Sequence, residues 1–156
     1  MKKTKRRQFI TLLGLGGAGM AINPAQAHHT DSHFEDKSVH HLVYQCNKAD
    51  NEYLEHVLFS CGEMLRKYGD DIELIVTAIG PGLNLLAHHP KRAISLEHQQ
   101  RVASLAAYGV RFQACGNTMK AMRWTEKDLV EFAQVVPIGV DEIMQLQERG
   151  YSYISW

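Results

Sequence analysis

From about residue 39 onward, segments in which apolar residues recur every second residue alternate with segments in which they recur every three or four residues. Runs that alternate every second residue predict strands, and spacings of three and four residues predict helices. Strands are predicted at residues 41–46, 71–79, 110–114, 134–138 and 151–155. Helices are predicted at residues 54–68, 83–88, 96–108, 125–133 and 140–149. Because strand and helix alternate, we expect an α/β domain with a parallel sheet covered on both faces.

Short polar motifs mark where these elements begin and end. Asp50 and Ser95 are typical N-cap residues at the starts of the first and third helices. Thr125-x-x-Asp128 has the form of a capping box. Gly80-Pro81-Gly82 is a turn that stops the second strand. Sites in sheets of this kind gather at the carboxyl ends of the strands, so a functional site is expected there.

The first 27 residues have the layout of a twin-arginine signal peptide. Arg6-Arg7-Gln8-Phe9-Ile10 matches the export pattern, an uncharged apolar stretch follows as far as Ile22, and Ala25-Gln26-Ala27 supplies the small residues that a signal peptidase requires. A membrane anchor is the alternative, but the apolar stretch is shorter than the roughly 20 residues of a spanning helix. We therefore expect cleavage after Ala27 and a periplasmic location without a stable membrane anchor. Residues 28–38 would form a flexible, histidine-rich arm ahead of a domain at residues 39–156.

The formal charge is balanced over the whole chain, with 17 basic and 17 acidic residues. Five of the basic residues and none of the acidic ones precede Ala27, so the mature chain would carry 12 against 17, a net charge of about −5. A negative domain lacks the basic surface that nucleic-acid binding requires, so no nucleic-acid partner is expected. The mature length suffices for one domain with a hydrophobic core.

Histidines are dense at the start of the expected mature chain. Their imidazole nitrogens favour copper, nickel or zinc, so a transition metal on this arm is a candidate cofactor, with five candidate ligands: His28, His29, His33, His40 and His41. These histidines show no fixed ligand spacing. A polar arm without a specific metal site is the alternative.

The three cysteines, Cys46, Cys61 and Cys115, are an odd number for an oxidising compartment, and no two of them form a C-x-x-C pair. At least one thiol is therefore free, or joined to another chain or a small molecule. Cys61 lies on the apolar face of the first predicted helix, which indicates a core residue. Cys46 ends the first strand, where it either packs in the core or lies close enough to Cys115 to react with it.

Cys115 stands at the exit of the third predicted strand. A thiol reacts as its thiolate, and a free cysteine with a pKa of about 8.5 is mostly protonated at neutral pH. If a helix begins at Asn117 or Thr118, the N–H groups of Gly116, Asn117 and Thr118 would face the sulfur and favour its anion. Gly116 would leave room for a sulfur donor, and the backbone at Gly80 would bind an anion. A buried structural cysteine is the alternative.

Two motifs resemble the DsrE/DsrF-like (YchN-like) family: Ala114-Cys115-Gly116-Asn117-Thr118-Met119 and the closing Leu146-Gln147-Glu148-Arg149-Gly150-Tyr151-Ser152-Tyr153. The resemblance covers nearly the whole mature chain. It implies a three-layer α/β/α fold around a five-stranded parallel sheet, and a homo-oligomer that is a trimer or a hexamer. It also implies a sulfur relay, in which Cys115 takes a sulfur atom from a donor as a persulfide and passes it to an acceptor protein.

Two functions of different classes stay open at this point. The first is a periplasmic sulfur carrier, sulfurtransferase-like at most, that depends on Cys115. The second is a non-catalytic module that binds a small ligand or a metal through the strand-end pocket or the histidine arm. A disulfide-linked assembly through Cys115 is a third, structural option.

Overall fold

The computed structural model describes residues 38–156, so the predicted signal peptide and most of the histidine arm lie outside the described residues. The strands are β1 (His40–Cys46), β2 (Ile72–Ala78), β3 (Arg111–Cys115), β4 (Ala133–Val136) and β5 (Ser152–Ile154). The α-helices are α1 (Asn51–Tyr68), α2 (Leu96–Ala107), α3 (Gly116–Met122) and α4 (Gly139–Glu148). Short 3-10 helices are η1 (Gly69–Asp71), η2 (Gly80–Leu86) and η3 (Glu126–Asp128). Among these described helices, none has the length and apolar character needed to span a membrane.

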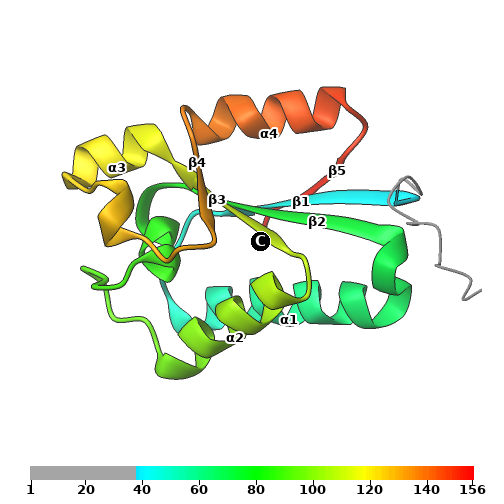
Figure 1. Cartoon of the computed structure of the whole chain (residues 1–156), viewed down its shortest axis with the longest axis horizontal. Coiled ribbons are helices and arrows are strands. Elements are labelled where there is room, and N and C mark those ends of the chain that lie inside the picture. Colours follow the sequence, from blue (N-terminus) through cyan, green and yellow to red (C-terminus); the bar gives the residue numbers. More distant parts are fainter. Residues whose placement is uncertain (1–37) are drawn as a thin grey trace, which may run out of the picture. The chain divides into compact units, whose positions relative to one another are not determined.

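All five strands are parallel and form one sheet in the order β4-β3-β2-β1-β5. Figure 1 shows α1 and α2 on one face of the sheet and α4 on the other. Because the strands share one direction, their carboxyl ends meet at the same edge of the sheet, and α3 begins there. The predicted three-layer α/β/α fold with a five-stranded parallel sheet is confirmed.

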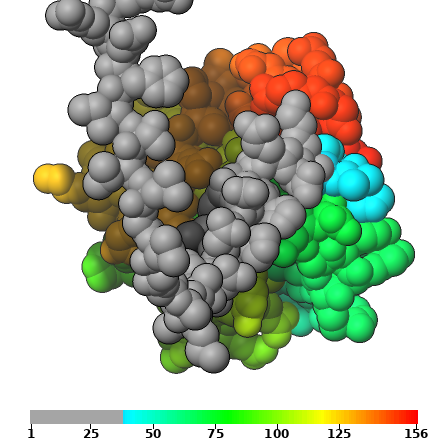
Figure 2. Space-filling view, turned by 45° about the vertical axis from the view of Figure 1, so that its right-hand side comes forward, coloured from blue at the N-terminus to red at the C-terminus, as the bar shows by residue number. Residues whose placement is uncertain are grey.

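The position of α4 follows from the strand order. β5 pairs with β1, with Leu42 opposite Ser152, and Figure 2 shows the red surface of the C-terminal residues next to the cyan surface at the start of β1. β4 pairs with β3 at the other edge, with Cys115 opposite Val136. The helix between β4 and β5 must therefore cross the whole sheet, and its first residue lies beside the end of β3.

Side chains alternate between the two faces of the sheet, and most of the hydrophobic core lies under α1 and α2. Leu42, Tyr44 and Cys46 of β1 pack there. A smaller core under α4 consists of the buried side chains of Val43, Ile75, Ile143 and Leu146. Since each fully buried apolar side chain contributes about 1.5–3 kcal/mol, the face under α1 and α2 supplies most of the hydrophobic stabilisation.

The predicted helix caps are confirmed. Asp50 accepts a hydrogen bond from the N–H of Tyr53 at 3.0 Å, and Ser95 accepts one from the N–H of His98 at 3.1 Å. Each bond satisfies an N–H group that has no partner within its helix. The first long helix ends at Gly69, whose φ of 56° is a conformation that glycine adopts without the steric cost of a β-carbon.

The helix predicted at residues 125–133 is wrong. The capping box is present, because the Asp128 carboxylate accepts hydrogen bonds from the N–H and the hydroxyl of Thr125 at 2.7 and 2.9 Å. It opens only the single turn of η3. Leu129 then pairs with Ala87 in an isolated antiparallel bridge. The extended backbone of this bridge cannot continue a helix, so long-range pairing overrides the local signal.

The short helix predicted at residues 83–88 is a 3-10 helix that begins earlier, at Gly80. The glycine-proline turn is part of it and packs against the end of β1. A β-carbon at Gly82 would lie 2.1 Å from the carbonyl oxygen of Cys46. Only glycine allows this approach of the two backbones.

Candidate functional site

Cys115 is the last residue of β3 and the residue that caps α3. Along β3, Phe112 and Ala114 pack in the larger core, so Arg111, Gln113 and Cys115 point to the opposite face, which α4 covers. Cys115 is 4% exposed. Its sulfur therefore lies in a layer between the sheet and the start of α4.

Gly139, the first residue of α4, lies against this sulfur. Its N–H donates a hydrogen bond to Sγ of Cys115 at 3.3 Å. The first N–H groups of a helix carry the positive end of the helix dipole, so this contact favours a thiolate. A β-carbon at Gly139 would lie 2.8 Å from Cγ1 of Ile79 and 3.0 Å from Cβ of Cys115. Glycine is therefore required for α4 to begin this close to the sulfur.

Two opposing effects act on the pKa of the Cys115 thiol. Burial raises the pKa, because the thiolate loses hydration. Hydrogen bonds from the Thr118 hydroxyl, from the Gly139 N–H and from the N–H groups of Thr118 and Asn117 lower it. Together they outweigh burial, so the pKa lies below its ordinary value. The Asn117 N–H also donates to the carbonyl oxygen of Pro137 at 3.2 Å.

Thr118 is held in place by Gly80. The N–H of Gly80 donates to Oγ1 of Thr118 at 3.0 Å, which leaves the hydroxyl hydrogen for the sulfur. Gly80 has a φ of 54°, again a conformation that suits glycine. The N–H of Gly80 is thus used within the chain, and its contribution to the site acts through Thr118.

Gly116 brings the connection between β4 and α4 close to the end of β3. A β-carbon at Gly116 would lie 3.1 Å from the carbonyl oxygen of Pro137 and 3.2 Å from that of Val136. The side of Gly116 where a β-carbon would stand is therefore filled by these carbonyl groups, which allows the start of α4 to pack close to β3. Gly116 also lines a hollow of about 550 Å³, and its role in admitting a sulfur donor stays a prediction.

Cys46 and Cys61 lie in a different environment. Both are fully buried in the larger core, and burial raises the pKa of Cys46 to about 12 and also raises that of Cys61. Cys46 and Cys115 point to opposite faces of the sheet, and β2 lies between their strands. Two strand spacings place their Cα atoms about 10 Å apart, beyond the limit of about 7 Å for a disulfide. The structure does not bring Cys46 to the Cys115 site.

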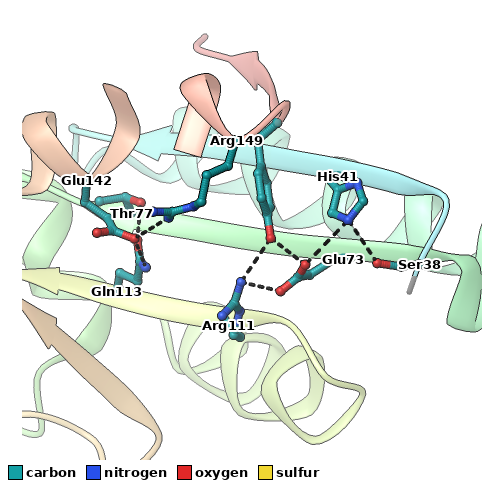
Figure 3. Close-up of polar contacts among 9 residues, drawn as sticks. Ser38, His41, Glu73, Thr77, Arg111, Gln113, Glu142 and Arg149 are labelled. Carbon is teal, nitrogen blue, oxygen red and sulfur yellow. Dashed lines mark hydrogen bonds and ion pairs between the residues drawn. The ribbon is translucent and has the colours of Figure 1, made fainter. Parts of the chain in front are cut away.

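A row of polar side chains holds the start of α4 on the sheet, as Figure 3 shows. Oγ1 of Thr77 donates to Oε1 of Gln113 at 2.8 Å, and Nε2 of Gln113 donates to Oε1 of Glu142 at 3.0 Å. Arg149 pairs with the same Glu142 oxygen at 3.4 Å. Glu142 belongs to the first turn of α4. The row therefore fixes the helix start and the N–H group that faces the sulfur.

A second polar group lies at the opposite end of the same face (Figure 3). The Glu73 carboxylate pairs with Arg111, accepts a hydrogen bond from the Tyr151 hydroxyl, and lies 3.9 Å from Nε2 of His41. Burial and the Glu73 carboxylate raise the pKa of Tyr151 to about 12, so Tyr151 stays protonated at neutral pH. These contacts link Tyr151, the residue before β5, to the first residues of β1, β2 and β3.

A hollow of about 450 Å³ opens beside Cys115. Its lining is mostly apolar and includes Ile79, Ile138 and Val140, with Arg92 as a cation. Asn117 and Thr118 also line it. The hollow gives a small molecule a place next to a sulfur that is otherwise buried.

The candidate metal ligands are only partly within the described residues. His40 and His41 point to opposite faces of β1, and the ring of His40 lies 4.4 Å from that of Tyr68 on α1. The structure therefore does not bring these two imidazoles together. Within residues 38–156, no group of three or more His, Cys, Asp or Glu side chains is placed to hold a metal ion. Metal binding by the arm stays a prediction, since its other ligands lie outside the described residues: His28, His29 and His33.

Replacing Thr118 with valine should raise the pKa of Cys115. Valine keeps the shape of threonine but has no hydroxyl to donate to the thiolate. Because the thiolate is the reactive form, alkylation by iodoacetamide should shift to higher pH. The rate at neutral pH should fall about two- to tenfold, which corresponds to the loss of one hydrogen bond.

The alkylation rate measured against pH checks this prediction. The Thr118→Ser variant retains the hydroxyl and is the matched control, with a profile close to that of the wild type. A Thr118→Val profile that does not move would contradict the role assigned to Thr118.

Sequence patterns missed Gly139, Arg92 and Gln113. The first two lie far from Cys115 in the chain, and their proximity depends on the path of the backbone across the sheet. Gln113 had a visible signal, because the two-residue period of β3 places it on the same face as Cys115. A polar residue on the inward face of a strand indicates a polar network under the helix that covers it.

The sequence model of the DsrE/DsrF-like family matches residues 37–156. No curated protein matches the chain. Among solved structures, MTH1491, a protein of unknown function from Methanobacterium thermoautotrophicum, is 26% identical with a TM-score of 0.68, over 75% of this chain and 99% of that one. The ychN protein of E. coli is 15% identical with a TM-score of 0.59, over 75% of this chain and 99% of that one, and this likeness shows the fold alone.

Proposed function

Since the chain belongs to the DsrE/DsrF-like family, which suggests sulfur relay at the family level, we propose that it is a sulfur carrier that holds sulfur as a persulfide on Cys115. One observation carries the choice of residue. Of the three cysteines, Cys115 has a pKa below the ordinary value, whereas burial raises the pKa of Cys46 and Cys61. A carrier thiol must ionise near neutral pH, and it must meet its donor. The hollow beside Cys115 supports the second requirement.

The loading step needs no oxidant. The electron pair of the Cys115 thiolate attacks the outer sulfur of a protonated donor persulfide, R–S–SH, and the proton stays on the transferred sulfur. A new S–S bond forms at Cys115, the donor's S–S bond breaks, and the thiolate R–S⁻ leaves. The Gly139 N–H stabilises the attacking anion. The transferred sulfur then extends from Cys115 into the hollow.

The transfer step is the same reaction in the opposite sense. An acceptor thiolate attacks the terminal sulfur, and the Cys115 thiolate is the leaving group. A thiolate of lower pKa leaves faster, so the contacts that favour the Cys115 anion assist both steps. Cys115 returns to its starting state without a net redox change.

We further propose that the protein works in the periplasm, as a homo-oligomeric trimer or hexamer, with a separate sulfur donor and acceptor. The twin-arginine pattern at Arg6 and Arg7 supports export. Ile138 and Val140, at the start of α4, are large exposed apolar side chains, and both line the hollow that contains Cys115. Such a patch beside Cys115 supports a protein partner close to the sulfur.

Onward transfer from loaded protein tests the carrier function. The protein is loaded with glutathione persulfide, desalted and mixed with reduced glutathione, and new glutathione persulfide is trapped with monobromobimane and quantified by mass spectrometry. A carrier loses its sulfur at the rate at which the trapped persulfide appears. A module that only binds a ligand in the hollow would retain no transferable sulfur after desalting.

A further inference from the structure

Arg92 places a positive charge in the hollow that contains Cys115. It is the charged side chain of that lining, and it is exposed. Within residues 38–156 no carboxylate forms an ion pair with Arg92. Its guanidinium is therefore available to bind an anion. The planar N–H groups of a guanidinium match the two coplanar oxygens of a carboxylate.

A second hollow, of about 430 Å³, lies next to the first. Pro81 and Arg92 line both, so they form the boundary between the two. Lys48 adds another cation to the second hollow. Asp50 also lines it, but its carboxylate caps α1. A molecule that reaches from Cys115 across Pro81 would meet Arg92 and then Lys48.

One buried side chain fixes the boundary between the two hollows. Asn84 is 1% exposed. Its Oδ1 accepts hydrogen bonds from the N–H groups of Lys91 and Arg92 at 2.8 and 3.0 Å, and its Nδ2 donates to the carbonyl oxygen of Pro81 at 2.8 Å. A single amide thus joins Pro81 to the backbone of Arg92. The backbone of Arg92 is therefore held at a fixed place relative to Pro81, which lines the same hollow as Cys115.

We propose that Arg92 is a specificity residue that binds the carboxylate of a low-molecular-weight persulfide donor. The inference rests on the proposed carrier function and names its substrate class. The outer sulfur of the donor lies at Cys115, and its carboxylate lies against Arg92. The Cys115 thiolate takes the outer sulfur, and the carboxylate-bearing thiolate leaves with the electron pair of the broken S–S bond.

The rate of sulfur uptake from two donors tests the assignment. Glutathione persulfide carries carboxylates, and the persulfide of 2-mercaptoethanol carries none. Arg92→Gln should lower the rate with glutathione persulfide about three- to fivefold, the effect of one exposed ion pair, and leave the rate with the other donor unchanged. Arg66→Gln, which removes an equal charge outside both hollows, is the matched control. Equal losses with both donors, or no loss, would overturn the role of Arg92.

A binding measurement separates this inference from the carrier function. S-methylglutathione has the carboxylates but no transferable sulfur, and its Kd is measured by NMR titration of the Cys115→Ser variant with and without Arg92→Gln. The Kd should rise about three- to fivefold when Arg92 is replaced. An unchanged Kd would overturn the anion site. A changed Kd without any sulfur uptake by the wild-type protein would support the anion site and overturn the carrier function.

Discussion

Replacing Cys115 with serine should abolish the uptake of sulfur from glutathione persulfide. The serine hydroxyl fills nearly the same space, but it is not ionised at neutral pH and does not form a persulfide. After desalting, treatment with cold cyanide should release thiocyanate in proportion to protein from the wild type and none above background from the variant. The free energy of unfolding should change by no more than about 1 kcal/mol, because the substitution leaves no large cavity.

Cys46→Ala and Cys61→Ala are the controls for this result. Both thiols are fully buried in the apolar core, and burial raises their pKa values. Each variant that remains folded by circular dichroism should therefore take up sulfur like the wild type. Uptake that persists in Cys115→Ser, or that disappears from either folded core variant, would contradict the assignment of the carrier thiol.

Replacing Gly82 with alanine should destabilise the fold by about 3 kcal/mol or more. The new β-carbon would lie 2.1 Å from the carbonyl oxygen of Cys46 and 2.6 Å from its carbonyl carbon. These backbone atoms have little freedom to move, because the same carbonyl oxygen accepts a hydrogen bond from the N–H of Ile79 at 2.9 Å. The clash must displace η2 from the end of β1.

Urea unfolding followed by circular dichroism measures this loss, and Gly62→Ala is its control. Gly62 lies inside α1 with nothing within 4 Å of the position of a β-carbon. Alanine should therefore stabilise that variant by up to about 1 kcal/mol through helix propensity. A Gly82→Ala protein as stable as the wild type would mean that η2 does not pack against the end of β1.

The order of strands and helices was predictable because local period and capping agree over most of the chain. In α1, the spacing of Leu54, Val57, Leu58 and Cys61 matches the buried face that the structure shows, and Asp50 caps the helix as expected. Where a local signal competed with long-range pairing, the prediction was wrong. The capping box at Thr125 is an example, since the bridge between Leu129 and Ala87 ends the helix after one turn.

The candidate site was only half predictable, for a related reason. Cys115 and Thr118 are close in sequence, so a strand exit followed by a helix start was enough to place them together. Gly139 contacts the sulfur only because α4 starts beside β3, and Arg92 lines the hollow beside it only because Asn84 fixes the loop that carries Arg92. Neither condition is visible in the local pattern of apolar residues, since the first depends on the strand order and the second on the hydrogen bonds of one buried amide.

Peptide mapping of the persulfide-treated wild-type protein shows which cysteine carries the transferred sulfur. The protein is treated with glutathione persulfide, its remaining thiols are blocked, and its peptides are compared by mass spectrometry before and after a reductant. We expect one additional sulfur atom on the peptide that contains Cys115, removed by the reductant, with Cys46 and Cys61 unmodified. Sulfur located on Cys46 or Cys61, or on no cysteine at all, would contradict the assignment of Cys115 as the carrier thiol.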